Sequence, residues 1–262
     1  MNKTVRKQKA FFLSVFLLLT FYLSPFTCLS WALTADEVVD KVDAAMREAK
    51  DSVAMSKMIL VEKDGSERVR QIKAYFKNNP KGDDLTLTRF LTPADVKGVS
   101  FLSLSENEMY LYMPAFGKIR RIASHVKHES FMGTDFSYDD IGKTKYKGDY
   151  DPKIVEETPA EYVIEATPKP KAEVGYSKVK LWVGKENWIP TKIEFYHSKK
   201  GSLLKVLTNS QIENIQGHWT PRKMVMENVE DKHKTVIEVT EIKYDTGLSN
   251  DIFSQRILKQ AE

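Results

Sequence analysis

The sequence predicts a mainly β protein built as a long antiparallel meander. After residue 50, apolar and polar side chains alternate along most segments, which is the pattern of half-buried strands. Turn signals such as Asp64-Gly65 and Lys200-Gly201 separate these segments at short intervals. No long helical pattern lies between them, so the strands pair with their neighbours in sequence. A single sheet of about ten such strands has to curl.

The first residues have the pattern of a secretory signal peptide. Basic residues are followed by the apolar run FFLSVFLLLTFYL, and Ser30-Trp31-Ala32 then offers small residues for cleavage. We predict cleavage after Ala32, which makes residues 1–32 the leader and residues 33–262 one domain. A retained membrane anchor is the alternative, but the apolar run is short for a bilayer span.

Charge and cysteine content narrow the classes of function. The chain has 40 Lys and Arg against 36 Asp and Glu. The leader holds four basic residues and no acidic ones, so the remainder has 36 of each. This balance gives no electrostatic case for nucleic acid as a partner. The single cysteine, Cys28, lies in the leader, so the rest of the chain has no thiol for disulfide or thiolate chemistry.

A helix opens the domain and strands follow. Thr34 and Glu37 have the spacing of a capping box, and apolar residues recur at helical spacing from Val38 to Ala49. The run TPKPKAEVG (167–175) is interpreted as a long hairpin loop, and residues 251–259 as a short helix. We expect strands over 58–62, 70–77, 85–91, 101–104, 109–113, 162–166, 178–183, 191–197, 203–212, 222–226 and 235–244.

Motifs of catalysis are missing from the sequence. There is no GxSxG elbow, no glycine-rich phosphate loop and no cysteine nucleophile after the leader. His125 and His128 fall in an expected loop without further ligands, so we expect no metal site. Asp139 and Asp140 are adjacent and point to different sides of a strand or helix, which favours a helix start over paired acid–base work. We therefore predict no catalytic residue and no cofactor.

The concave face of the predicted sheet needs something to fill it. One amphipathic helix is too small to cover such a face, so side chains or a ligand must occupy it. Long, flexible side chains recur there at alternating positions, and methionine suits surfaces that adapt to variable apolar ligands. Each of these residues alone is compatible with an ordinary core. As a set they predict a cavity lined by Leu102, Leu104, Met109, Leu111, Met113, Phe116, Met224 and Met226.

The segment FMGTDFSYDDIG, residues 131–142, breaks the alternation and is called the lid segment below. We predict that Thr134 or Asp135 caps a short helical turn from Tyr138 to Ile141, and that the aspartates face solvent. A packed crossover that does not move is the alternative. The residues expected to bend the chain or plug the cavity mouth are Phe131, Met132, Gly133, Phe136, Tyr138, Ile141 and Gly142.

Two runs in this region, MYLYMPAFGKIRRI and SFMGTDFSYDDI, resemble the signature of the LolA-like outer-membrane lipoprotein-sorting family. The order of elements agrees over essentially the whole chain after the leader. The resemblance implies an incomplete, half-closed antiparallel β-barrel with an N-terminal helix and short lid helices. In that family the barrel encloses a cavity for acyl chains. The chain is more similar to the broad LolA-like branch, often associated with RND-type exporters, than to the classical periplasmic carrier.

The combined prediction is a periplasmic, monomeric, non-enzymatic carrier or chaperone. It would bind the acyl chains of lipoproteins for transfer to the outer membrane, with an inner-membrane transporter of ABC or RND type as partner and no nucleic acid. One alternative is a carrier of a free lipid or glycolipid that works with an RND-type exporter. Another is an envelope lipid hydrolase that uses Asp139, Asp140 or His125. A static envelope scaffold is the third.

Overall fold

The computed structural model describes residues 32–80, 82–142 and 145–260. Contacts divide the chain into residues 1–32 and residues 33–262, and the second unit holds every element described below. The predicted leader, apart from Ala32, and Cys28 lie outside the described residues. In the part of the chain that is described, no helix is long and apolar enough to cross a membrane.

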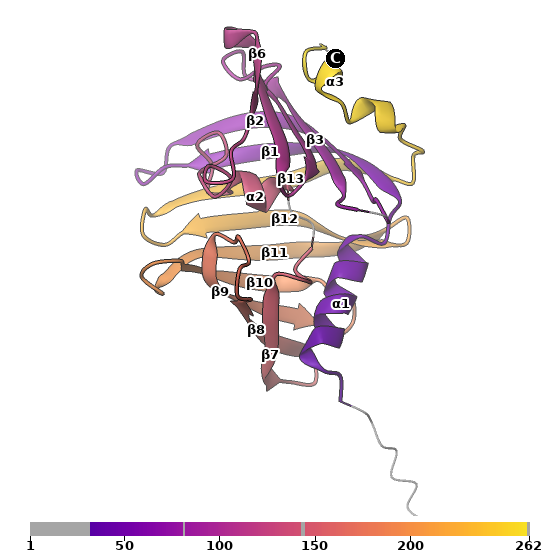
Figure 1. Cartoon of the computed structure of the whole chain (residues 1–262), viewed down its shortest axis with the longest axis vertical. Coiled ribbons are helices and arrows are strands. Elements are labelled where there is room, and N and C mark those ends of the chain that lie inside the picture. The colour runs from indigo at the N-terminus through magenta and orange to yellow at the C-terminus, as the bar shows by residue number, and fades with distance from the viewer. Residues whose placement is uncertain (1–31, 81, 143–144, 261–262) are drawn as a thin grey trace, which may run out of the picture. The chain divides into compact units, whose positions relative to one another are not determined.

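One curled antiparallel sheet dominates this unit (Figure 1). Its order is β6-β5-β4-β3-β2-β1-β13-β12-β11-β10-β9-β8-β7, so two meanders are joined where β1 pairs with β13. The edge strands β6 and β7 do not pair with each other, and the sheet is not closed into a barrel. The predicted mainly β, half-closed architecture is confirmed. The strands are β1 (Asp51–Val61), β2 (Glu67–Lys77), β3 (Leu85–Thr92), β4 (Ser100–Ser105), β5 (Glu108–Met113), β6 (Lys118–Arg121), β7 (Tyr150–Glu157), β8 (Glu161–Pro168), β9 (Tyr176–Gly184), β10 (Pro190–His197), β11 (Leu203–Ile215), β12 (His218–Asn228) and β13 (His233–Tyr244).

The helices are few and short. The predicted capping box of α1 (Ala35–Met46) is present, because the Thr34 N–H donates to Glu37 Oε2 at 2.8 Å and the Glu37 N–H donates to Thr34 Oγ1 at 3.3 Å. The valines of α1 are buried in the main core. The helix expected over 251–259 is two separate turns, η2 (Asn250–Ile252) and α3 (Gln255–Leu258). The remaining helices are η1 (Pro114–Phe116) and α2 (Tyr138–Gly142).

The two strands that the sequence did not predict, β6 and β7, are the edges of the sheet. β6 has only four residues, and β7 contains Pro152 and several charged side chains. Edge strands tolerate proline and charge because one side of their backbone needs no partner, and this removes the pattern by which strands are recognised. The first half of β1 was also missed. A hairpin loop joins β8 and β9 as predicted, but it is shorter than residues 167–175, because Thr167 and Pro168 belong to β8.

Apolar side chains gather on both faces of the first meander. The main core fills the concave face, and a second cluster on the other face contains Leu87, Leu102, Phe253 and Leu258. The Arg89 guanidinium donates to the carbonyl oxygens of Ile257 and Gln260, which holds the C-terminal turns against this outer face.

The connection from β6 to β7 carries the lid segment and α2 across the concave side of the sheet (Figure 1). The backbone approaches β4 and β5 closely at Gly142. A Cβ atom at this position would lie 3.0 Å from Met109 Cε and 3.2 Å from Ser103 Oγ. The crossover is therefore packed into the sheet, and glycine permits the approach.

Candidate functional site

A cavity of about 290 Å³ lies on the concave side of the second meander. Its apolar wall comes from β9 to β12. Met46 of α1, Phe136 of the lid segment and α2 contribute the opposite side. A smaller cavity of about 110 Å³ lies beside α1, and Tyr146 and Tyr150 line both cavities. The apolar wall of the larger cavity includes Val179, Ile193, Phe195, Leu207, Met224 and Met226.

The structure brings two of the eight residues predicted for a cavity, Met224 and Met226, to this one. Met109 and Leu111 are buried in the main core, and Met113 packs against that core. These three residues lie on β5, at the far end of the concave face from β9 to β12. They belong to a part of the concave face that the protein fills itself.

The other three predicted residues lie away from the concave face. Leu102 pairs with Tyr110, and both belong to the outer cluster together with Leu104, because paired residues on adjacent strands share a face. Phe116 is 59% exposed in the turn between β5 and β6, with the Arg120 guanidinium 5.4 Å from its ring centre. The prediction that these residues face the cavity did not anticipate that β4 has an apolar outer face, which the C-terminal turns cover.

The first part of the lid segment, residues 131–135, packs into the concave face of the sheet and is called the wedge below. Phe131 is fully buried, and its ring centre lies 5.8 Å from that of Phe90, 5.3 Å from that of Phe101 and 5.4 Å from that of Tyr138. The Phe131 N–H donates to the Phe136 carbonyl at 2.7 Å, and Arg70 donates to the Met132 carbonyl at 2.8 Å. Such contacts between aromatic rings stabilise the folded state by more than the burial of apolar surface area alone. The wedge occupies the space at β2 to β5.

Asp135 anchors this wedge to β13. Its carboxylate accepts from Thr235 Oγ1 at 2.7 Å and contacts His233 Nδ1 at 2.7 Å, while its N–H donates to Thr235 Oγ1 at 3.0 Å. The prediction that the aspartates face solvent is wrong, since Asp135 and Asp139 are buried. A carboxylate can be buried when other groups hydrogen-bond to it, and the sheet supplies those groups here.

The second half of the lid segment is α2, and Ser137 caps it where Thr134 or Asp135 had been predicted to. The Asp140 N–H donates to Ser137 Oγ at 3.0 Å, and the Ser137 N–H donates to Asp140 Oδ2 at 2.8 Å. The predicted turn from Tyr138 to Ile141 is confirmed.

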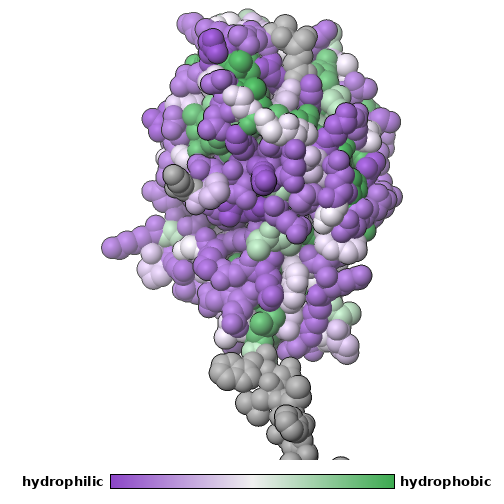
Figure 2. Space-filling model, turned by 90° about the vertical axis from the view of Figure 1, so that its right-hand side faces the viewer, coloured by the Kyte–Doolittle hydropathy of each residue, from purple (hydrophilic) through white to green (hydrophobic). Residues whose placement is uncertain are grey.

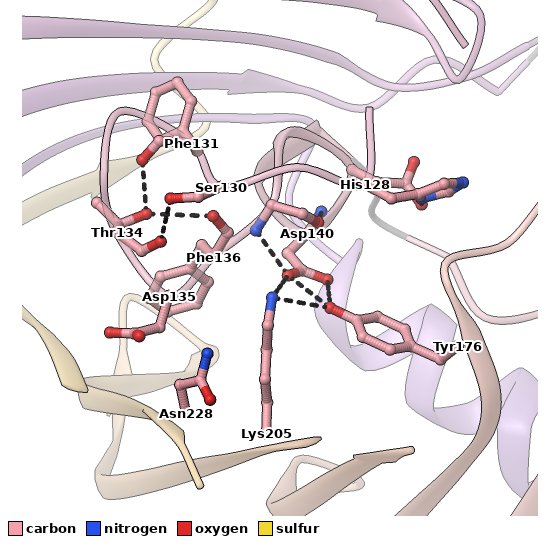
Figure 3. A network of polar contacts seen from close by, with 12 residues as sticks. His128, Ser130, Phe131, Thr134, Asp135, Phe136, Asp140, Tyr176, Lys205 and Asn228 are labelled. Atoms are coloured by element: carbon pink, nitrogen blue, oxygen red, sulfur yellow. Dashed lines mark hydrogen bonds and ion pairs between the residues drawn. The ribbon is translucent and has the colours of Figure 1, made fainter. Parts of the chain in front are cut away.

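Asp140 also ties α2 to the sheet (Figure 3). The Tyr176 hydroxyl on β9 donates to both carboxylate oxygens, at 3.0 and 2.9 Å. Lys205 Nζ on β11 lies 3.5 Å from Asp140 Oδ2 and 3.3 Å from the Tyr176 oxygen. We call these three residues the Asp140 cluster. The side chains of Asp140 and Lys205 are each 11% exposed, so their charges depend on each other.

Pairs of polar side chains lie between the cavity and an open polar groove of about 810 Å³. Asp139 and Asp140 line the cavity, whereas their partners His128 and Lys205 line the groove. His128 Nδ1 lies 3.7 Å from Asp139 Oδ2. The wall between the cavity and the groove therefore contains one Asp–Lys ion pair and one Asp–His contact.

The surface offers no comparable apolar site on the face shown in Figure 2, which is mainly hydrophilic with scattered apolar patches. No group of three or more His, Cys, Asp or Glu side chains in the described ranges could hold a metal ion. The large apolar side chains that are exposed in those ranges are Met46, Val69, Phe116, Val155 and Val229.

Comparisons with known proteins agree with this architecture. A family model whose description reads only "uncharacterized protein" matches residues 82–260. A structure titled as a putative outer membrane lipoprotein-sorting protein domain from Vibrio parahaemolyticus is 29% identical with a TM-score of 0.80, covering 86% of this chain and 98% of that one. A LolA superfamily protein from Nitrosomonas europaea is 25% identical with a TM-score of 0.70, covering 86% and 100%. This chain belongs to the LolA-like family.

The LolA-like chain is also similar to a DUF1329 family protein from Desulfovibrio piger. That structure is 30% identical with a TM-score of 0.79, and the alignment covers 87% of this chain and 100% of the other. No curated protein matches this sequence. The likenesses extend over almost the full length of the solved chains, so they concern the whole LolA-like fold.

Sequence reasoning missed most of the residues around the cavity. Ile193, Phe195 and Leu207 lie in segments whose strand alternation was recognised, so the signal for their shared face was present. Tyr146 and Tyr150 belong to a stretch that received no prediction. The sequence of a strand shows which residues share a face, but it does not show which part of that face stays empty.

Proposed function

We propose that this LolA-like protein is a non-enzymatic carrier that holds acyl chains of lipoproteins in the cavity for transfer to the outer membrane. The observation that supports it best is a largely apolar cavity on the concave face, beneath α1 and α2, in a chain of this family. A donor of ABC or RND type in the inner membrane is part of the proposal.

The energetics of acyl transfer fit a carrier. Burying one methylene is worth about 0.8 kcal/mol, so a long acyl chain gains on the order of 10 kcal/mol in a fitted cavity. A membrane offers a similar gain. Cargo therefore exchanges between the two environments without a covalent step, and small differences in cavity shape set the direction.

The volume of the cavity indicates that loading requires movement. About 290 Å³ is at the small end of ligand pockets, which span roughly 300–1,000 Å³. Phe136 and α2 are among the parts of the wall that do not belong to the sheet or to α1, together with Lys145, Tyr146 and Ile189. We propose that the Phe136 side chain and residues 139–142 of α2 shift when a long chain enters, while Phe131 and Tyr138 stay packed against each other.

Hydrogen exchange tests this movement. Amides of α2 should exchange faster than those of Met109 to Met113 in empty protein and slow when an acyl ligand is bound. Amides at Thr134 and Asp135 serve as the internal reference, because they donate to the Phe131 carbonyl and to Thr235 Oγ1 of β13. Equal protection of α2 in empty and loaded protein would show that the crossover is fixed.

The proposed location is the periplasm, reached by cleavage after Ala32. N-terminal sequencing of secreted protein should begin at Leu33. A retained leader or an acylated Cys28 would overturn this part of the proposal.

Cargo identity is decided by extracting lipid from protein purified from its own cell and analysing it by mass spectrometry. Acylated peptides would support lipoprotein cargo, and a free lipid or glycolipid would support the alternative carrier. The hydrolase alternative relies on residues that have other partners or face solvent. Asp140 is held by Tyr176 and Lys205, Asp139 faces His128, and His125 is exposed. That alternative predicts product release from a bound lipid that is lost in Asp140→Asn.

A further inference from the structure

The cavity has a polar end. Tyr146, Tyr150 and Tyr176 line it together with the carboxylates of Asp139 and Asp140. The first two tyrosines also line the smaller cavity beside α1, so these hydroxyl-bearing side chains lie where the two spaces meet. A purely hydrocarbon ligand could not form hydrogen bonds with these side chains.

The backbone N–H of Tyr146 is hydrogen-bonded to α1, while its side-chain hydroxyl has no hydrogen-bond partner within the described residues. The N–H groups of Tyr146 and Lys147 each donate to the Asp43 carboxylate of α1 at 2.9 Å. Lys147 also pairs with Asp40, one turn earlier on α1. The side chain is thus positioned by α1, and its hydroxyl is available to a ligand.

The tyrosines remain hydrogen-bond donors at neutral pH. Burial raises the pKa of Tyr146, and the charge of Asp140 raises it further. Burial likewise raises the pKa of Tyr150, and Asp139 adds to the effect. The phenols therefore stay protonated and lie within electrostatic reach of the two carboxylates, which supply acceptors.

Of the described basic side chains near this end, Lys205 contacts Asp140 and His128 contacts Asp139, both from the groove side. Lys145, which lines the cavity, donates to the Gly82 carbonyl at 3.0 Å. A phosphate placed here would meet the two carboxylates, and of the described residues that line the cavity only Lys145 carries a positive charge. Repulsion between like charges in a buried site is costly, so a phosphorylated head is disfavoured.

We propose that this polar end is a subsite for an uncharged hydrogen-bonding group of the cargo, an amide or a hydroxyl next to the acyl chain, and that phospholipids are rejected. An amide offers one donor and one acceptor, which matches carboxylate oxygens beside tyrosine hydroxyls. The inference rests on the proposed acyl-carrier function and adds the chemical class of the cargo.

Competition against a fluorescent fatty-acyl probe tests it. Four ligands of equal chain length are compared: an N-acyl ethanolamine, a monoacylglycerol, a lysophosphatidic acid and a plain alkane. The amide and the glyceride should displace the probe at concentrations at least tenfold lower than the lysophosphatidic acid. Equal displacement by the amide, the glyceride and the lysophosphatidic acid would overturn the subsite while leaving the carrier function intact. If no ligand binds, including the alkane and the probe, the carrier function itself fails.

Tyr146→Phe locates the subsite. The variant should bind the amide roughly three- to tenfold more weakly, the effect of one lost hydrogen bond, and bind the alkane as the parent does. Its folding should be unchanged, because the hydroxyl has no partner in the described part of the protein. Tyr196→Phe is the matched control, since that hydroxyl donates to Glu194 at 2.8 Å and does not line the cavity. Unchanged amide binding in Tyr146→Phe, or an equal loss in the control, would overturn the assignment.

Discussion

Leu207 of β11 provides a direct test of the cavity, because its side chain lines an existing void. Tryptophan at this position should displace about four methylenes of a bound chain. At about 0.8 kcal/mol each, the ligand loses about 3 kcal/mol, which is roughly a hundredfold in affinity. Filling a void of about 290 Å³ should meanwhile raise the free energy of unfolding, by about 0.5–2 kcal/mol for substitutions of this kind. Binding and stability are therefore expected to change in opposite directions.

The assay for Leu207→Trp is titration with a fluorescent acyl probe, paired with urea unfolding. Thr208→Trp is the matched control, because the next residue of the strand points to the opposite face and is exposed. The control should bind as the parent does. A folded Leu207→Trp variant with parental affinity would refute the cavity as the acyl site. An equal loss in both variants would show an effect on the strand and would refute the reasoning as well.

Three further predictions concern stability. Asp51 is buried and accepts four hydrogen bonds from the turn at 246–248. Burial alone would raise the pKa of this carboxyl, but those hydrogen bonds lower it overall. The ionised carboxylate therefore stabilises the folded protein fully above the unfolded pKa of 3.8. This stabilisation is lost as the pH falls through the lower pKa of the folded state. Asp51→Asn should cost about 1.5–3 kcal/mol at pH 7 in urea unfolding, and the difference from the parent should shrink in acid. Asp140→Asn should cost about 3–5 kcal/mol because it leaves the Lys205 charge buried, and adding Lys205→Met should recover most of it in a double-mutant cycle; additive losses would contradict the pairing. Phe131→Ala should lower the free energy of unfolding by about 3–5 kcal/mol and Phe116→Ala by less than about 0.5 kcal/mol, and comparable losses would contradict the contrast in burial.

The sequence predicts the sheet well because most strands have one buried face and one face toward solvent. Residues 192–195 alternate between polar and apolar side chains, and in β10 Ile193 and Phe195 are buried while Lys192 and Glu194 are not. The edge strand β7 was not predicted because it contains Pro152 and charged side chains, which a central strand would not tolerate and which remove the alternating pattern. The capping box at Thr34 was recognisable because both of its partners are local in sequence.

The site was harder to predict because its formation depends on register and on long-range contacts. Leu102 and Met109 both have the size and pattern of cavity residues, yet the β4–β5 register places them on opposite faces. The buried state of Asp135 depends on Thr235, 100 positions later in the chain. Neither relation can be derived from local spacing, and alternation alone is compatible with both faces.

The division of the concave face explains how this protein can stay folded when its cavity is empty. A large apolar void destabilises a protein, because its lining loses contacts that nothing replaces. In this protein the wedge around Phe131 fills the part of the concave face at β2 to β5, and Asp135 fixes that wedge to β13. The void lies against β9 to β13 and the first residue of β7, where α2 is tied to the sheet by the Asp140 cluster. The lid segment thus fills one part of the concave face with Phe131 and borders the void in the other part with Phe136 and α2, so under the proposed function different side chains of one segment serve folding and cargo binding.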